Sequence, residues 1–191
     1  MEVKEFQRLA LRTESKVDKV EVNTELLKST LALIATLNQI LDGLKKSIYY
    51  NDDKKLESFK QSTLLQPMIL AGIGKLLDEL DDYDNKEVLD TNSRVLHGIV
   101  GMSTESGELL EALMNSLQDN KPIDATNVSE EMHDSSWYMA IVHDELELIW
   151  TEGLANLIAK LKIRFPDKFT NENAGSRDLK AERLALEGKR D

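Results

Sequence analysis

The stretch Leu96-His-Gly-Ile-Val-Gly-Met-Ser-Thr-Glu105-Ser-Gly-Glu108-Leu-Leu-Glu-Ala-Leu113 is the most informative part of this 191-residue chain. Its apolar residues recur with the period of an amphipathic helix. A second stretch, Glu130-Glu-Met-His-Asp134-Ser-Ser-Trp-Tyr138, is helical in the same way. A turn at Asp119-Asn-Lys-Pro122 lies between them. Because this connection is short, we expect two antiparallel helices that pack against each other.

The same helical period extends over most of the chain. The predicted helical segments are residues 3–15, 20–50, 54–80, 91–118, 126–150, 153–164 and 172–188. Pro67 should kink or split the third of these, and residues 81–85 should form a loop. No segment has the pattern of a strand. The sequence therefore predicts an all-α helical bundle, with residues 1–191 forming a single domain.

Composition narrows the class of protein. Hydrophobic residues make up 41% of the chain, which is enough to bury a core. The net charge of -11 makes binding to a nucleic-acid backbone unfavourable, so we expect no nucleic-acid partner. There is no cysteine, which excludes disulfides and thiolate metal sites. Residues 1–10 are charged and unlike a signal peptide, and no apolar run reaches the roughly 18 residues of a membrane span. These features favour a cytoplasmic protein without a membrane partner.

Two carboxylate pairs stand out in the two central stretches. Glu105 and Glu108 are three residues apart, as are Glu131 and Asp134, so each pair lies on one helix face. Two packed helices can bring all four carboxylates together. Their mutual repulsion at about 4 Å, roughly 4 kcal/mol at an effective dielectric of 20, is relieved by a hard cation such as Mg²⁺ or Mn²⁺. The alternative is that each pair is an ordinary solvated helix surface.

The neighbouring residues favour the metal site. The run Ser136–Val142 is apolar enough to be buried, so we expect Asp134 to face a partly enclosed space. Ser106 and Gly107 are small, and we expect the two helices to approach closely there.

At these residues the chain resembles the MazG-like nucleotide pyrophosphohydrolases, especially those encoded by phages. The family signature is Glu-x-x-Glu followed, after a variable gap, by Glu-x-x-Asp; here 22 residues separate Glu108 from Glu131. Similarity also extends to Glu5–Thr13, Lys160–Phe169 and Arg177–Arg183, so that it covers residues 1–15 and 94–187. One departure is His133, which stands where the family usually has glycine.

The resemblance implies an all-α bundle that hydrolyses a nucleoside triphosphate, with a deoxynucleotide favoured, to the monophosphate and pyrophosphate. It implies Mg²⁺ at Glu105, Glu108, Glu131 and Asp134, with Glu105 or Glu108 orienting or deprotonating the attacking water. It also implies a homo-oligomer, most simply a dimer.

Four further residues are candidates for binding the substrate. Lys160 and Arg164 can hold phosphate oxygens, although cations at a helix C-terminus are also ordinary. Asn156 lies one helical turn before Lys160, a spacing that differs from most relatives. Trp137 follows Asp134 by three residues and can stack on a base, although a core tryptophan is an equal alternative.

Residues 17–93 separate the first helix of the resemblance from the signature. Shifted by 69 positions, they align without gaps to the region 94–150 and match its apolar pattern. Leu41 then corresponds to Leu110, and Leu44 to Leu113. The four acids become Thr36, Gln39, Ser62 and Leu65. Two interpretations remain open: a degenerate internal repeat, which would make the chain two fused half-units, or an unrelated helical insertion.

A protein of another class also fits the sequence. It is a non-catalytic helical binding or regulatory protein derived from the same family, whose acidic surface contacts a partner. Retention of all four acids favours the enzyme, because the region aligned with them has lost every one.

Overall fold

The computed structural model describes residues 1–187, which fall into two compact units. Unit 1 consists of Met1–Val20 and Asp90–Asn156. Unit 2 consists of Glu21–Leu89 and the described chain after Asn156. Helices account for 75% of the residues and strands for 3%, which confirms the all-α class. No helix in the described part of the chain is both long enough and apolar enough to cross a membrane.

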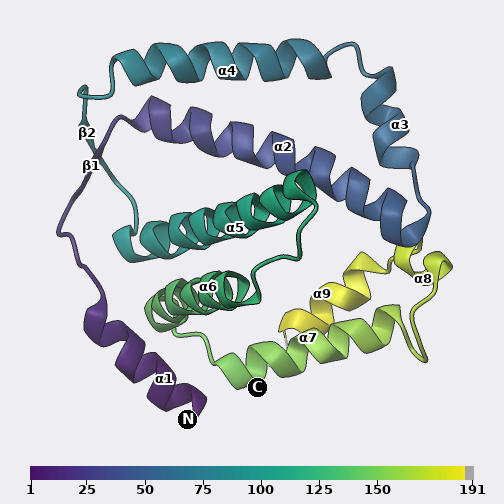
Figure 1. Cartoon of the computed structure of the whole chain (residues 1–191). Helices are drawn as coiled ribbons and strands as arrows, with labels where there is room; N and C mark the ends of the chain where they lie inside the picture. The colour runs from purple at the N-terminus through teal and green to yellow at the C-terminus, as the bar shows by residue number, and fades with distance from the viewer. Residues whose placement is uncertain (188–191) are drawn as a thin grey trace. The chain divides into compact units, whose positions relative to one another are not determined.

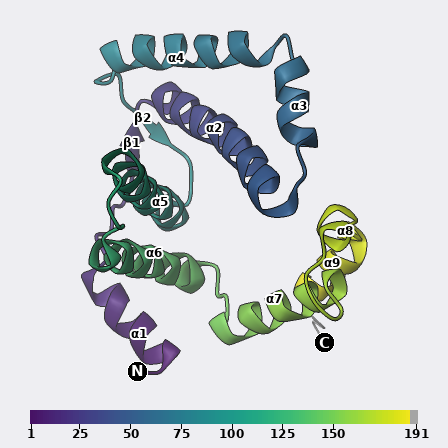
Figure 2. The ribbon, with the colours of Figure 1, turned by 45° about the vertical axis from the view of Figure 1, so that its right-hand side comes forward.

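Unit 1 is built around a hairpin of two long helices, α5 (Ser93–Asp119) and α6 (Ala125–Glu145), which lie side by side (Figures 1 and 2). Asn92 begins α5 by accepting hydrogen bonds from the backbone N–H groups of Arg94 and Val95. The left-handed Asn120 ends it. Asp124 caps α6 in the same way as Asn92 caps α5. The predicted hairpin is therefore present, and it places the two carboxylate-bearing stretches on facing helices.

The N-terminal segment of unit 1 packs against this hairpin. It forms α1 (Val3–Ala10) and a turn of 3₁₀ helix, η1 (Leu11–Thr13). Arg94 reaches it by pairing with Glu14, whose side chain is only 1% exposed. The same guanidinium also binds Asp144 and Glu145 near the end of α6. One arginine thus connects α5, α6 and the N-terminal segment.

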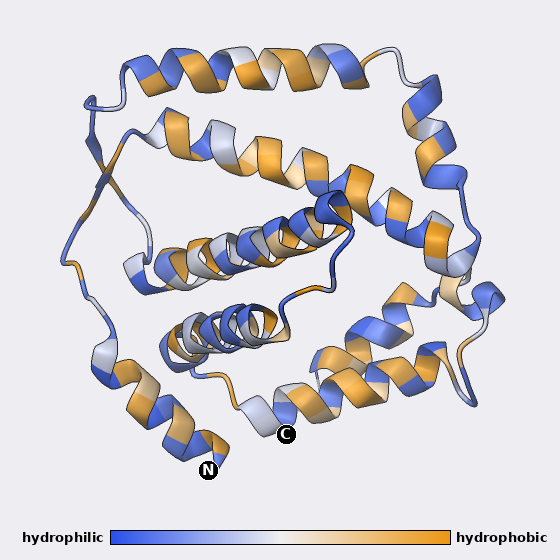
Figure 3. Ribbon diagram, in the orientation of Figure 1, coloured by the Kyte–Doolittle hydropathy of each residue, from blue (hydrophilic) through white to orange (hydrophobic). Residues whose placement is uncertain are grey.

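Unit 2 contains α2 (Thr24–Tyr50), α3 (Lys54–Gln61) and α4 (Leu65–Asp81). Both α3 and α4 pack against α2, and apolar residues recur along α2 and α4 at helical intervals (Figure 3). Pro67 does not split a helix as predicted. It occupies the first turn of α4, where its missing N–H group would have no helical partner. The break instead falls at residues 62–64, where the Ser62 hydroxyl accepts hydrogen bonds from the backbone of Leu64 and Leu65.

Two short strands, β1 (Val20–Val22) and β2 (Glu87–Leu89), pair into a two-stranded sheet. The expectation that the chain has no strand is therefore wrong. Three residues are too few to show the alternation by which a strand is recognised. Pairing arises because the fold brings together two segments that are far apart in the sequence, which no local pattern reveals.

The final part of the chain contains α7 (Trp150–Arg164), α8 (Asn171–Gly175) and α9 (Leu179–Glu187). The division between the units falls within α7. The predicted single helix over 172–188 is instead two helices. The hydroxyl of Thr170 caps the first of them by accepting a hydrogen bond from the backbone N–H group of Asn173. The last residue of that prediction, 188, lies outside the described residues.

Candidate metal centre

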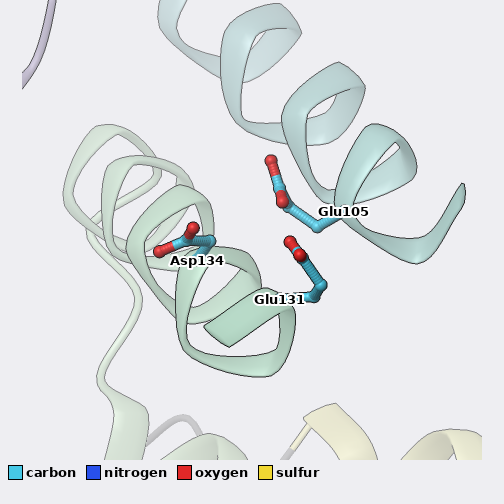
Figure 4. Close-up of side chains that lie close together, drawn as sticks. All are labelled: Glu105, Glu131 and Asp134. Carbon is cyan, nitrogen blue, oxygen red and sulfur yellow. The ribbon is translucent and has the colours of Figure 1, made fainter. Parts of the chain in front are cut away.

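Three of the four predicted carboxylates converge between α5 and α6. One oxygen from each of Glu105, Glu131 and Asp134 lies within 4.8 Å of the other two. Glu105 points from α5 toward Glu131, and Asp134 stands one turn further along α6 (Figure 4). Glu105 and Glu131 are buried, whereas Asp134 is exposed. The site therefore has a closed side, formed by the helix interface, and an open side at Asp134.

The electrostatics of this cluster oppose the ionisation of Glu105. Burial raises the pKa of its carboxyl group above the ordinary value of 4.5, and a hydrogen bond with Glu131 raises it further. The negative charges of Glu108, Asp134 and Glu131 act in the same direction. A divalent cation between these oxygens would remove the repulsion. The donors are all carboxylate oxygens, which suit Mg²⁺ or Mn²⁺ and do not suit a soft metal.

Two glycines on α5 allow the helices to come this close. A Cβ atom on Gly101 would lie 2.1 Å from the ring of Tyr138, and one on Gly98 would lie 2.4 Å from Val142. The sequence placed the close approach at Ser106 and Gly107, which is wrong. Gly107 has no neighbour within 4 Å of its Cβ position, and Ser106 is exposed. Gly98 and Gly101 lie two turns and one turn before Glu105, so the contact they permit sets the spacing of the carboxylates.

Two residues that the sequence analysis did not select also belong to the site. Asn127 donates a hydrogen bond from Nδ2 to Glu131 Oε1 at 2.7 Å and so orients that carboxylate. Tyr138 packs on Gly101, and its pKa is raised by burial and then by the negative charges of Glu105, Asp134 and Glu108. Asn127 precedes Glu131 by one helical turn, and this spacing is the signal by which it could have been found.

Glu108 lies outside the group of three. It is exposed on α5, one turn beyond Glu105, and still close enough to raise the pKa of Glu105 and Tyr138. The four predicted ligands therefore divide into three that converge and one that lies beside them.

No match exists for this chain among protein-family models, curated proteins or solved structures. The resemblance to the MazG-like enzymes thus rests on the residues quoted above alone.

The predicted substrate-binding residues of unit 1 lie in different settings. The indole Nε1 of Trp137 donates to the Ala10 carbonyl at 3.0 Å and to the Thr13 hydroxyl at 2.9 Å. Its ring also makes edge contacts with His97 and Tyr138. These contacts give Trp137 a structural role in holding the N-terminal segment. Asn156 lies on α7, at the end of unit 1.

The two predicted cationic residues, Lys160 and Arg164, belong to unit 2. Arg164 donates two hydrogen bonds to the carboxylate of Glu182 on α9. Arg177 binds the same carboxylate, and together the two guanidinium groups hold the pKa of Glu182 well below its usual range. Arg164 is therefore committed to an ion pair within its own unit.

The departure at His133 leaves the cluster undisturbed. Its side chain is exposed, and Nδ1 contacts the Ser129 carbonyl one turn earlier on α6. The ring therefore lies along its own helix.

Proposed function

We propose that this protein is a Mg²⁺-dependent pyrophosphohydrolase of the MazG-like kind, which converts a nucleoside triphosphate to the monophosphate and pyrophosphate. The observation that carries the proposal is the convergence of Glu105, Glu131 and Asp134 within 4.8 Å. This convergence occurs in the hairpin whose sequence resembles the family signature. A deoxynucleotide substrate and a homodimeric assembly are further parts of the proposal and rest on the resemblance alone, whereas Mn²⁺ as an alternative ion rests on the all-carboxylate donor set.

The proposal gives each residue of the site a separate role. Glu105, Glu131 and Asp134 would hold the ion, and Asn127 keeps the Glu131 carboxylate oriented. A bound divalent ion neutralises phosphate charge and lowers the pKa of a water molecule. Glu108 is adjacent, exposed and outside the group of three, which suits it to accept a proton from the attacking water. The water oxygen bonds to the α-phosphorus, the bond from that phosphorus to the bridging oxygen breaks, and pyrophosphate leaves.

The test is release of pyrophosphate from a panel of ribo- and deoxyribonucleoside triphosphates in the presence of Mg²⁺. We expect at least one nucleotide to yield pyrophosphate and its monophosphate in equal amounts, with no orthophosphate. Glu131→Gln should reduce the rate by at least about 100-fold, the scale on which a catalytic group contributes. Glu111→Gln, an exposed change on α5 outside the cluster, should leave the rate unchanged.

Orthophosphate as the only product, or no turnover with any nucleotide, would contradict the proposal. It would favour the second candidate, a non-catalytic binding or regulatory protein. One pair of contacts favours that candidate: Arg164 is engaged by Glu182, and the Trp137 N–H group by Ala10 and Thr13. Two of the residues expected to contact a nucleotide are thus already occupied within the protein.

A further inference from the structure

Helices α2 and α5 correspond residue by residue. Each has 27 residues, and their first residues, Thr24 and Ser93, are 69 positions apart. Each begins after an asparagine that caps the helix through its side-chain oxygen. Each ends at an asparagine in the left-handed conformation, with φ of 50° in both cases. The corresponding caps are Asn23 with Asn92 and Asn51 with Asn120.

The helices packed on α2 and α5 correspond as well, with a different offset. Asn23 Nδ2 donates to Glu79 near the end of α4, and Asn92 Nδ2 donates to Glu145 at the end of α6. This equivalence shifts α4 by 66 positions onto α6. The less exposed positions of α4 are 65, 69, 72, 76 and 79, and adding 66 gives 131, 135, 138, 142 and 145, all buried or half-buried in α6. The two hairpins thus share one packing register.

The exposed faces of α2 and α5 also match, because corresponding apolar side chains are exposed to the same extent. Leu41 is 43% exposed and its counterpart Leu110 is 44% exposed, while Ile48 and Leu117 are 71% and 73% exposed. Leu44 and Leu113 are a third pair of the same kind. Helical periodicity by itself would align apolar stripes, but it would not produce matching caps and a matching contact from the cap to the partner helix.

We infer that the α2–α4 hairpin is a second copy of the α5–α6 hairpin, in which the four carboxylates of the site have been lost. At the observed offsets, the counterparts of Glu105, Glu108, Glu131 and Asp134 are Thr36, Gln39, Leu65 and Met68. The gapless alignment named Ser62 for the third position, which the packing corrects to Leu65. The three-residue difference arises in the connection between the helices, where the first copy has α3 and a break.

A cavity of about 460 Å³ lies between α2 and α4 beside the position of the replaced site, and Glu25, Lys28 and Lys75 are among the residues that line it. Thr36 and Met68, two of the four counterparts, line it, as do Ala32 and Gly72. Gly72 stands where the other copy has Tyr138, and Ala32 stands where it has Gly101. In α5–α6 the tyrosine ring fills the space above the glycine. In α2–α4 the ring is missing, and a Cβ atom on Gly72 would lie 3.7 Å from Leu33 Cδ1.

This pattern of loss has a physical reason. Removing clustered acids relieves repulsion, so a copy that no longer binds an ion loses them without losing stability. The less exposed positions of α4 keep the register of those in α6, although most of the side chains at these positions differ.

A double-mutant cycle tests the inference without reference to metal or activity. Gly72→Tyr alone should lower the melting temperature, because in α5–α6 a Cβ at the position of Ala32 would lie 2.1 Å from the ring of the corresponding tyrosine. Ala32→Gly should then relieve the clash. The melting temperature of the double variant should be several degrees higher than the two single shifts would give if they were additive. The matched control is Gly74→Tyr with Ala32→Gly. Gly74 is exposed on the same helix with no neighbour within 4 Å, and its pair should be additive.

Additive shifts at position 72, like those of the control, would overturn the inference. If Gly72→Tyr alone fails to fold, a double variant that recovers a cooperative unfolding transition supports the inference. A double variant that remains unfolded counts against it.

A second experiment rests on the proposed function. Introducing Thr36→Glu, Gln39→Glu, Leu65→Glu and Met68→Asp together should raise the number of Mn²⁺ ions bound per chain from one to two, measured by equilibrium dialysis with folding checked by circular dichroism. A folded variant that binds one ion contradicts the duplication. If the unaltered protein binds none, the proposed function fails, and the tyrosine cycle still decides the duplication.

Discussion

Folding buries the Glu105 side chain among other carboxylates, which disfavours its ionised form. In the folded chain its pKa lies above the ordinary value of 4.5 because of burial and the neighbouring carboxylates. Between these two pKa values the folded state therefore holds more protons than the unfolded state. The free energy of unfolding must then fall as the pH rises from about 4.5 through the raised pKa of Glu105. The cluster is therefore destabilising near neutral pH in the absence of a cation.

We accordingly expect Glu105→Gln to raise the melting temperature of the metal-free protein at pH 7, because a neutral amide does not repel its neighbours. The gain should shrink as the pH is lowered toward 4, where Glu105 is protonated in both states. Each kcal/mol corresponds to about 2–4 °C in a chain of this size. Thermal unfolding in a chelator between pH 4 and 8 measures the difference.

Millimolar Mg²⁺ should make the melting temperature of the unaltered protein higher than that of Glu105→Gln. The unaltered protein should gain stability from binding the ion, and Glu105→Gln should gain much less. Glu111→Gln, which leaves the cluster intact, should behave like the unaltered protein both with and without Mg²⁺. A melting temperature of the unaltered protein that does not respond to Mg²⁺ would contradict the assignment of the site.

At the scale of elements, the α5–α6 hairpin depends on two backbones approaching closely beside the carboxylates. Gly101 lacks the Cβ atom that would otherwise overlap the ring of Tyr138. Gly107, on the same helix, faces open space. Substitutions at these two glycines therefore distinguish the effect of the helix contact from the low helix propensity of glycine.

Gly101→Ala should lower the free energy of unfolding by about 1–3 kcal/mol, since overpacking forces the ring or the helix to move. It should also weaken the stabilisation by Mg²⁺, because moving α5 away from α6 separates Glu105 from Glu131. Gly107→Ala should instead raise the free energy of unfolding by about 0.5–1 kcal/mol through helix propensity. Urea unfolding of both variants, with and without Mg²⁺, checks these outcomes, and equal effects would show that the contact is unimportant.

At the scale of the whole molecule, the chain builds each compact unit from separated segments. Residues 1–20 join 90–156 in unit 1, and the intervening residues contribute to unit 2. Unit 1 therefore needs contacts that hold its N-terminal segment to a hairpin about 80 positions later. Arg94 with Glu14, and Trp137 with Ala10 and Thr13, make these contacts.

Arg94→Met should destabilise the protein by about 3 kcal/mol, because it leaves the buried Glu14 carboxylate with only the exposed Lys16, 3.8 Å away, as a cationic partner. Arg94→Lys should lose less, since it keeps the charge and only the forked geometry is lost. Urea unfolding at pH 7 measures both losses. Similar, small losses in the two variants would mean that the Glu14 carboxylate is solvated rather than dependent on this pair.

The sequence by itself determined the features that depend on neighbours a few residues away. Helical periodicity indicated α5 and α6, and the three-residue spacings put each carboxylate pair on one helix face. The all-α class followed from the same local information.

Only the tertiary structure decided which distant side chains meet. It placed the close contact at Gly101 rather than Gly107, separated Glu108 from the converging three, paired β1 with β2, and joined Arg164 to Glu182. These outcomes depend on which surfaces remain to be filled once the helices pack, and residues far apart in the chain jointly set that requirement. A local pattern carries the period of a helix but not the identity of the side chain opposite it.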